Sequence, residues 1–292
     1  MPVSSRTRVI LPQNLDYTRV TEHTASMSPS IGIRVYSNTN PKIWRTSELQ
    51  KGLIFVYDDA ERIGEATGFG VPIIKSSDET YFSGSSSVYL QHAGEATTIY
   101  KEYCMDRLAR NVYRNIRLEN RQIRSMLKRF SDLYQRNKRS RSPMLMLKRV
   151  PMKIGVNSSF VKTAPLGRAV VTYKIWENRI LVEADFTRLK QPIPEKIFMM
   201  NEQGTSFFRR YQDSCGKQFV DGQAGAWDHV TADWATITNT EGNIGFRLRK
   251  ASNSILRMGR EFQEGYLDWI GLDYEVDPKI KTFRYEIEVL GA

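Results

Sequence analysis

The sequence is poor in cysteine and histidine. Its 292 residues contain two cysteines, Cys104 and Cys215, and three histidines, His23, His92 and His229. Two cysteines are too few for a disulfide framework, and neither has a neighbour at the spacing that a zinc site needs. We therefore expect two buried thiols, no metal and no cofactor. A G-x-S-x-G nucleophile elbow is also missing, which disfavours serine-hydrolase chemistry.

Long apolar runs are missing as well. No window approaches the roughly 18–20 apolar residues that a membrane-spanning helix requires, and residues 1–13 have no apolar core of the signal-peptide kind. The sequence therefore predicts no membrane span and a cytoplasmic protein. Apolar residues nevertheless make up 40% of the chain, with 14 Tyr, 13 Phe and 5 Trp, which is ample material for a buried core.

Strand patterns dominate from residue 31 onward. Apolar stretches of strand length recur at intervals of about ten residues, with turn residues between them and little helical periodicity. Residues 58–62 have the composition of a tight connection, and residues 176–179 that of a short hairpin turn. The pattern predicts a mainly β fold, a large antiparallel β-sandwich.

Positive charge is concentrated in one segment. Residues 107–149 contain fourteen basic and two acidic residues, a net charge of +12, whereas the whole chain carries +11. A local cationic surface is therefore implied. Apolar residues at 123, 126, 127, 130, 133 and 134 follow helical spacing and predict a helix over residues 119–137. Residues 108–118 fit either a helix or a strand.

These patterns predict the organisation of the chain. We expect a loosely ordered lead-in over residues 1–30, because polar clusters and prolines interrupt any periodicity there. A single β-sandwich domain follows over residues 31–292. It is interrupted by a basic helical insertion at about 105–143.

Three interpretations of the basic segment stay open. It could neutralise phosphates on nucleic acid, attract an acidic polysaccharide or a lipid surface, or form a solvated helix face. The segment has few aromatic side chains for stacking on nucleobases. The candidate polyanion-binding residues are Arg114, Arg117, Arg121, Arg124, Lys128 and Arg129.

The glycine-rich stretch 64–70 resembles a phosphate-binding loop in composition but lacks the flanking features of one. Such a loop is followed directly by a helix and contains a Lys-Ser or Lys-Thr pair, and neither is present. The alternative is a bend or bulge that leads into a strand over residues 71–75.

Polar residues of several kinds gather in residues 201–213. Glu202 and Asp213 are candidate catalytic acids or bases, and Arg209 and Tyr211 are candidate substrate-binding residues. The alternative is a polar turn between two strands, with Tyr211 packed and the arginine solvated.

Tryptophan stands beside acids in residues 227–234. Asp228 and His229 are candidate catalytic residues there, and Trp227 and Trp234 are candidate substrate-binding residues. An indole face stacks on the C–H groups of a sugar while carboxylates accept hydrogen bonds from its hydroxyls. The alternative places these tryptophans in a sandwich core, within a strand predicted over residues 227–238.

The strand sequences near the C-terminus are rich in aromatics, such as Leu-Asp-Trp-Ile-Gly-Leu-Asp-Tyr at 267–274 and Phe-Arg-Tyr-Glu-Ile at 283–287. With the strands from residue 31 onward, they resemble the galactose-mutarotase-like β-supersandwich proteins. The resemblance implies a concave sheet that binds carbohydrate, which some members isomerise or cleave. Mutarotases use histidines and a glutamate, and no pair of histidines matches that pattern here, so no catalytic role is carried over.

The leading hypothesis is a carbohydrate-related β-sandwich protein, with an enzyme acting on a sugar or uronate (an isomerase, lyase or hydrolase) as its finer form. One alternative is a noncatalytic module that binds a polyanion, nucleic acid or acidic polysaccharide, through residues 107–149. The other is a structural or interaction protein without a small ligand.

Overall fold

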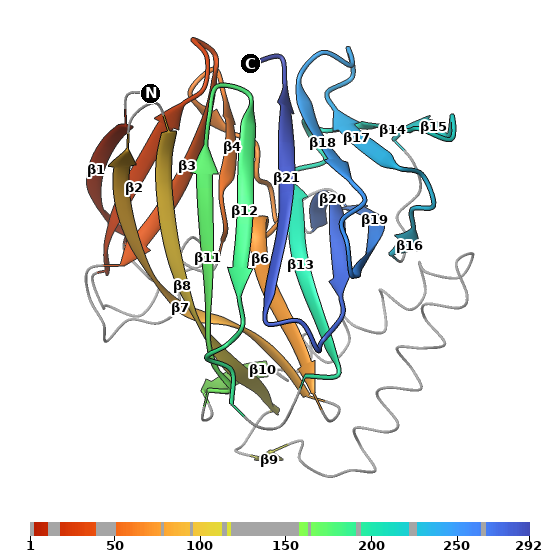
Figure 1. The fold of residues 1–292 in the computed structure, drawn as a ribbon. Coiled ribbons are helices and arrows are strands. Elements are labelled where there is room, and N and C mark those ends of the chain that lie inside the picture. Colours follow the sequence, from red (N-terminus) through yellow and green to blue (C-terminus); the bar gives the residue numbers. More distant parts are fainter. Residues whose placement is uncertain are drawn as a thin grey trace. The chain divides into compact units, whose positions relative to one another are not determined.

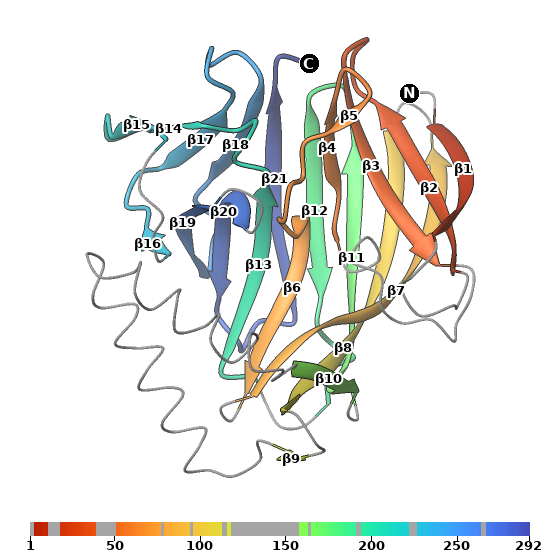
Figure 2. The ribbon, with the colours of Figure 1, turned by 180° about the vertical axis from the view of Figure 1, so that it is seen from behind.

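The computed structural model describes residues 3–10, 18–38, 51–76, 79–93, 96–112, 116–117, 158–162, 165–190, 194–221, 227–263 and 267–292. The regular structure within these ranges is β-strand, and the strands pair antiparallel (Figures 1 and 2). The prediction of a mainly β, antiparallel fold is confirmed. The helix predicted over residues 119–137 lies outside the described residues. Within the described ranges, no helix has the length and apolar character to cross a membrane.

The N-terminal sheet has the strand order β1-β2-β3-β4-β5. Its strands are β1 (Val3–Ile10), β2 (Thr18–Ser26), β3 (Ile31–Asn38), β4 (Ile54–Tyr57) and β5 (Ala60–Glu61). Residues 1–30, expected as a loosely ordered lead-in, thus supply two strands of this sheet. Strand pairing uses main-chain groups, so it does not require the apolar periodicity that this stretch lacks.

A two-residue turn joins β4 to β5. Asp58 and Asp59 both have positive φ, 48° and 59°. Positive φ at both central residues is the requirement of a type I′ hairpin, and aspartate tolerates it better than most residues do. The tight connection predicted over residues 58–62 is therefore confirmed at its start.

The large sheet has the strand order β15-β14-β17-β18-β21-β12-β11-β8-β7-β6-β13-β20-β19-β16, with β9 and β10 also paired to β8. Its first strands are β6 (Gly68–Ser76), β7 (Glu79–Ala93), β8 (Ala96–Val112), β9 (Ile116–Arg117), β10 (Ser158–Lys162), β11 (Gly167–Ile175), β12 (Arg179–Asp185) and β13 (Lys196–Gln203). The remaining strands are β14 (Arg210–Asp213), β15 (Gln218–Val220), β16 (Asp228–His229), β17 (Trp234–Thr238), β18 (Gly245–Arg249), β19 (Ser254–Gln263), β20 (Leu267–Val276) and β21 (Thr282–Leu290).

Side chains of alternating burial organise the large sheet. In β11, Ala169, Val171, Tyr173 and Ile175 are buried and the residues between them are partly or fully exposed. This period of two is what a strand with one covered face requires. The predicted hairpin between β11 and β12 is confirmed, since the amide of Trp176 donates to the carbonyl of Arg179 at 2.9 Å.

The two sheets share one hydrophobic core. The ring of Phe55 in β4 packs edge-on against Phe208, with 5.2 Å between centroids. The buried amide of Gln203 in β13 accepts a hydrogen bond from the Phe55 amide and donates one to the Leu53 carbonyl, both at 3.2 Å. A buried polar side chain thus joins β13 to the N-terminal sheet through both its oxygen and its nitrogen.

The single strand predicted over residues 227–238 is wrong. The structure has β16 at one end of the strand order and β17 near the other. Residues 230–233, which belong to no strand, separate them. Residues 205–207 form a turn after β13, in which the Gly204 carbonyl accepts the Phe208 amide at 3.0 Å.

The chain forms two compact units. One comprises residues 1–105 and 165–292, and the other comprises residues 106–164. In the second unit, the end of β8 pairs with β9 and β10. Residues 108–118, whose sequence fits either a helix or a strand, are therefore strand at 108–112 and 116–117. A helix there would not provide the ladder pairing that the structure shows.

Candidate functional site

A polar and aromatic face is formed by β13, β20 and β19. Successive side chains of a strand point to opposite faces. In β20, Ile270, Leu272 and Tyr274 enter the core, so the odd-numbered residues share the other face. Cross-strand pairing adds odd-numbered residues of β19 and even-numbered residues of β13 to it. We call the following residues the indole–carboxylate patch: Trp227, Trp269, Glu202, Asp273, Glu261 and Arg257.

Two glycines make room for the patch. Gly259 in β19 pairs with Gly271 in β20, which pairs with Glu202 in β13. A Cβ on Gly271 would lie 2.8 Å from Cγ of Glu202, and a Cβ on Gly259 would lie 2.8 Å from the ring of Trp227. Glutamate and indole therefore lie directly on the sheet backbone, as the absence of side chains at these glycines permits.

The two indoles stack on each other. The ring centroids of Trp227 and Trp269 are 5.1 Å apart, with 21° between the planes. The guanidinium carbon of Arg257 lies 6.0 Å from the Trp227 ring and 5.2 Å from that of Phe198. Aromatic surface and a cation are thus combined on one part of the sheet.

Glu202 is buried, with 6% of its surface exposed. Its Oε2 accepts hydrogen bonds from the amide of Thr67 at 3.1 Å and from the hydroxyl of Thr67 at 2.8 Å. The pKa of Glu202 is raised to about 7, chiefly by burial; the Thr67 hydrogen bonds oppose this shift and the charge of Glu261 adds to it. A carboxyl with such a pKa can give or take a proton near neutral pH.

Asp273 is buried beside it. Its Oδ1 accepts the amide of Asn201 at 2.7 Å. Burial, and then the charge of Glu202, raises the pKa of Asp273 well above its usual range, while the Asn201 amide and Arg257 act against this. Because each carboxylate disfavours the ionisation of the other, the two titrate as a pair.

Glu275, a further acid on this face of β20, is already neutralised. Glu275 accepts hydrogen bonds from Arg257 at 3.2 Å and from Lys196 at 2.6 Å. Arg257 therefore divides its charge between Glu275 and the buried pair. Because this cation is shared, it balances less of the negative charge of the buried carboxyls than a dedicated ion pair would.

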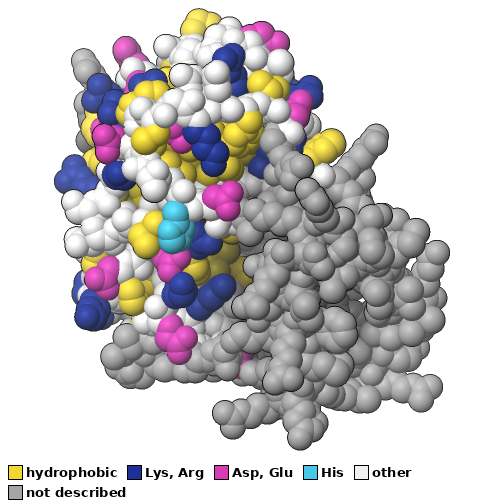
Figure 3. All heavy atoms as spheres, turned by 90° about the vertical axis from the view of Figure 1, so that its right-hand side faces the viewer, with side chains coloured by type: hydrophobic (Ala, Val, Ile, Leu, Met, Phe, Trp, Pro, Cys, Tyr) yellow, Lys and Arg dark blue, Asp and Glu magenta, His cyan; other side chains and the backbone are white. Residues whose placement is uncertain are grey.

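The structure brings four of the sequence-predicted residues to this region. Glu202 and Trp227 belong to the patch, and His229 in β16 is the cross-strand partner of Arg257. Asp228 lies next to His229, opposite Met258, and both β16 side chains are exposed. Figure 3 faces the side of Figure 1 on which β16 and β19 lie, and shows a histidine with basic, acidic and apolar side chains gathered there.

Three other sequence-predicted residues lie in β14 and β17, near the opposite end of the strand order. The hydroxyl of Tyr211 donates to Asp213 at 2.7 Å. The other oxygen of Asp213 accepts the amides of Cys215 and Lys217 at 2.9 and 3.1 Å, which closes the turn between β14 and β15. The guanidinium of an arginine, Arg247, covers the Trp234 ring at 4.8 Å.

The remaining predicted residues fall elsewhere. Arg209 forms an ion pair with Asp221 outside the patch. Arg117 belongs to β9, and its side chain is not described. The other candidate polyanion-binding residues lie outside the described residues: Arg114, Arg121, Arg124, Lys128 and Arg129.

Sequence reasoning missed Asp273, Arg257 and Glu261, and considered Trp269 only as part of the aromatic strand at 267–274. Their signal is the period of two within β19 and β20, where odd positions carry arginine, glycine, tryptophan and acids while even positions are mainly apolar. Thr67 had no such signal, because its contact with Glu202 bridges 135 positions of the sequence.

A small hollow elsewhere on the large sheet has a different character. Phe186, Ile197 and Ile280 line it, together with Lys190 and Lys281, and no carboxylate takes part. It offers no acid or base of the kind found in the patch.

No protein-family model matches the chain, and no curated protein matches it in sequence. Three solved structures show similarity in backbone. Alpha-N-acetylgalactosaminidase NagBb from Bifidobacterium bifidum, in its GalNAc complex, has a TM-score of 0.49 and 8% identity over 91% of this chain and 35% of NagBb. HI1317 has a TM-score of 0.41 and 7% identity, and the match covers 97% of this chain and 99% of HI1317. Slr1438 from Synechocystis sp. PCC 6803 has a TM-score of 0.35 and 9% identity, and the match covers 98% of this chain and 96% of Slr1438.

The chain thus spans 35% of the length of NagBb. TM-scores below 0.5 establish no common fold, so the patch is interpreted from the residues of this chain alone.

Proposed function

We propose that the protein binds a carbohydrate at the indole–carboxylate patch and acts on it as an enzyme. The observation that carries the proposal is the stack of Trp227 on Trp269 beside the buried carboxyl pair of Glu202 and Asp273. A supersandwich-like arrangement of the sheets is part of the same proposal.

The aromatic half of the patch suits a sugar ring. Pyranose rings expose patches of C–H groups that pack on an indole face, while carboxylates accept hydrogen bonds from the hydroxyls around them. Arg257 adds a cation that would pair with the carboxylate of a uronate.

The acidic half of the patch supplies the chemistry. Glu202, with its pKa raised to about 7, acts as the proton-transferring group, and Thr67 fixes the orientation of its carboxyl. The charge of Glu202 raises the pKa of Asp273, which we therefore assign as the coupled partner of Glu202 and not as the proton-transferring group. Proton transfer at a sugar carbon or oxygen is common to isomerases, lyases and hydrolases, the three reaction classes in question.

Glycan binding tests the proposal. Neutral and uronic oligosaccharides are screened on an array, and the best ligand is titrated by tryptophan fluorescence and calorimetry. Trp227→Ala removes about 1–1.5 kcal/mol of stacking, so affinity falls about tenfold. Trp234→Ala is the matched control, because that ring is covered by Arg247 in another part of the sheet. Glu202→Gln keeps binding and loses turnover.

The proposal fails if no glycan binds, or if Trp227→Ala and Trp234→Ala lower affinity equally. Retained turnover in Glu202→Gln would remove the catalytic part and leave a binding protein.

The net charge of +12 in residues 107–149 supports a second candidate, a polyanion-binding module. Its affinity for heparin or DNA would fall steeply with salt, because bound counterions are released. A chain without residues 107–142 would lose that affinity if the candidate is right and keep it if not. A third candidate, a structural protein without a small ligand, is favoured if both experiments are negative.

A further inference from the structure

A β-bulge interrupts the pairing of β6 with β13. Val71 lies opposite Met200, and the next pair along the ladder is Phe69 with Asn201. Gly70 therefore has no opposite residue, and its φ of 74° is a conformation that glycine adopts without strain. The bend or bulge predicted for the glycine-rich stretch is thus confirmed as a bulge, which changes the register by one residue.

The bulge decides which way Glu202 faces. Directly opposite residues of an antiparallel pair point to the same side of the sheet. With the bulge, Glu202 lies opposite Gly68 and accepts the amide and hydroxyl of Thr67. Without it, the register from Met200 would place Glu202 opposite Phe69, whose ring is buried in the core. The bulge therefore lets Glu202 face the patch while Phe69 enters the core.

The side chain of Asn201 provides hydrogen-bond partners at the bulge. Its Oδ1 accepts the Gly70 amide at 3.1 Å, and its Nδ2 donates to the carbonyls of Met199 and Leu272, both at 3.2 Å. The backbone amide of Asn201 donates to Oδ1 of Asp273 at 2.7 Å. One fully buried residue thus joins the bulge to a carboxylate of the indole–carboxylate patch.

Two core tyrosines anchor this arrangement. The hydroxyl of Tyr285 in β21 donates to Oδ1 of Asn201 at 2.7 Å. The hydroxyl of Tyr173 in β11 lies 3.0 Å from the carbonyl oxygens of both Phe69 and Gly70. Both tyrosines are buried, and their strands are not neighbours of β6 or β13 in the strand order. They therefore hold the bulge through the core.

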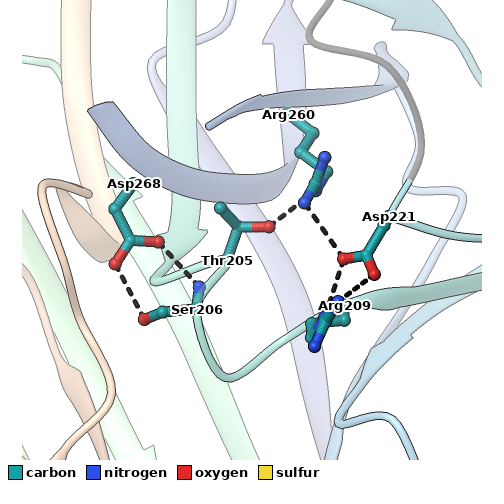
Figure 4. Close-up of polar contacts among 6 residues, drawn as sticks. All are labelled: Thr205, Ser206, Arg209, Asp221, Arg260 and Asp268. Atoms are coloured by element: carbon teal, nitrogen blue, oxygen red, sulfur yellow. Dashed lines mark hydrogen bonds and ion pairs between the residues drawn. The ribbon is translucent and has the colours of Figure 1, made fainter. Parts of the chain in front are cut away.

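The end of β13 beyond Glu202 is held separately (Figure 4). Asp268 in β20 accepts the amide and the hydroxyl of Ser206 at 2.7 and 2.8 Å. The side chain of Gln203 joins the same end of β13 to the N-terminal sheet. A change at the bulge should therefore alter the position of Glu202 locally and leave the rest of β13 in place.

We infer that Asn201 is a positioning residue of the indole–carboxylate patch, and that the Tyr285 hydroxyl locks it against the bulge. In this role it holds its own amide on Asp273 and, through the register that the bulge sets, Glu202 beside Thr67. The inference rests on the proposed function, because the position of these carboxyls affects turnover only if the patch is where a proton is transferred.

Tyr285→Phe tests the inference. It removes one hydroxyl and keeps the ring, so Asn201 loses the hydrogen bond that fixes its side chain. The donors to Glu202 and Asp273 stabilise the ionised carboxylates, so both should keep their protons to higher pH when these donors are loosened. Carbon-13 NMR titration is expected to show the Glu202 midpoint raised by about half a pH unit or more. In glycan turnover, kcat should fall about tenfold while KM changes less than about twofold.

Tyr211→Phe is the matched control. The Tyr211 ring is also buried and its hydroxyl donates to Asp213 at the same distance, 2.7 Å, but it lies near the other end of the strand order. The control loses a comparable hydrogen bond, yet its Glu202 midpoint and kcat are expected to stay unchanged. The charged groups around Glu202 are the same in all these variants: Asp273, Glu261 and Arg257.

Tyr173→Phe gives an independent answer, also if Tyr285→Phe does not fold. It releases the two carbonyls of the bulge and should raise the Glu202 midpoint in the same direction. Unchanged midpoints in both variants would overturn the positioning role, whatever the turnover, and so would an equal shift in Tyr211→Phe. Absence of turnover in the unaltered protein would instead contradict the proposed function, and the midpoints would still decide the role of Asn201.

Discussion

Glu202 in β13 and Asp213 in β14 are equally inaccessible, each with 6% of its surface exposed, but their surroundings differ. Asp213 accepts hydrogen bonds from Tyr211, Cys215 and Lys217, all within four positions of it in the sequence. Glu202 accepts its hydrogen bonds from Thr67, 135 positions away, and lies beside Asp273 and two indoles.

The difference separates a structural acid from a candidate functional one. Local donors that satisfy both oxygens stabilise a turn, as around Asp213. A carboxyl whose neighbours include other acids is held in a less favourable state by the fold as a whole. Such perturbed groups concentrate at functional sites.

A buried base, Lys101, extends this comparison, and its replacement should change stability more than the other substitutions below. Lys101 in β8 is fully buried, donates to the Lys51 carbonyl, and has its pKa lowered to about 7 by burial. The unfolded chain keeps this proton up to about pH 10.5, so stability rises as pH rises from about 7 to about 10.5.

Lys101→Met is therefore expected to raise the free energy of unfolding by roughly 4 kcal/mol at pH 7 and by much less at pH 10, measured in urea. Lys174→Met, at an exposed position of β11, should change little. An unchanged or lower stability of Lys101→Met at pH 7 would contradict the assignment of a buried amine with a lowered pKa.

Asp213→Ala tests the structural side of the comparison. It removes three hydrogen bonds and leaves two backbone amides of the turn without their acceptor, so stability should fall by about 3 kcal/mol. Urea denaturation measures this, with Asp233→Ala as the exposed control. A loss below about 1 kcal/mol would show that the turn does not depend on Asp213.

Glu202→Gln tests the functional side. The folded pKa of Glu202 is raised to about 7, whereas the unfolded chain releases the proton near 4.5. The folded state therefore holds more protons between these values, and stability falls as pH rises through them. Glutamine should remove the part of this fall that Glu202 contributes and raise stability at pH 7 by about 2 kcal/mol. Parallel pH profiles of the two proteins would contradict the burial of an ionisable Glu202.

Gly259→Ala should have the smallest effect on stability, about 1 kcal/mol. Its new Cβ would lie 2.8 Å from the Trp227 ring, so the indole must shift and the stack on Trp269 is disturbed. Tryptophan fluorescence should report the shift and glycan affinity should fall with it. If both stay as in the unaltered protein, the indole stack does not depend on the glycine.

The fold was predictable where local signals dominate. Period-two burial in β11, the hairpin at residues 176–179 and the aspartate turn at residues 58–59 are set by neighbouring residues. Strand order was not predictable, because it depends on pairings between distant segments. The predicted strand over residues 227–238 failed for this reason, since its two halves pair with β19 and with β14 and β18.

The candidate site was predictable only in part. Residue chemistry identified Glu202, Trp227 and His229, and the structure places them in or beside the patch. The same chemistry also selected Asp213, whose polar neighbours serve a turn. The pairing of β13 with β20 places Glu202 in the patch, and nothing within either strand encodes that pairing.

The proton affinity of Glu202 tests the central claim most directly. A carbon-13 NMR titration of the side-chain carboxyls, assigned by comparison with Glu202→Gln, should show Glu202 titrating near pH 7. A Glu202 midpoint near the ordinary value of 4.5 would mean that this carboxyl is solvated like any other and that the patch is not a site for proton transfer.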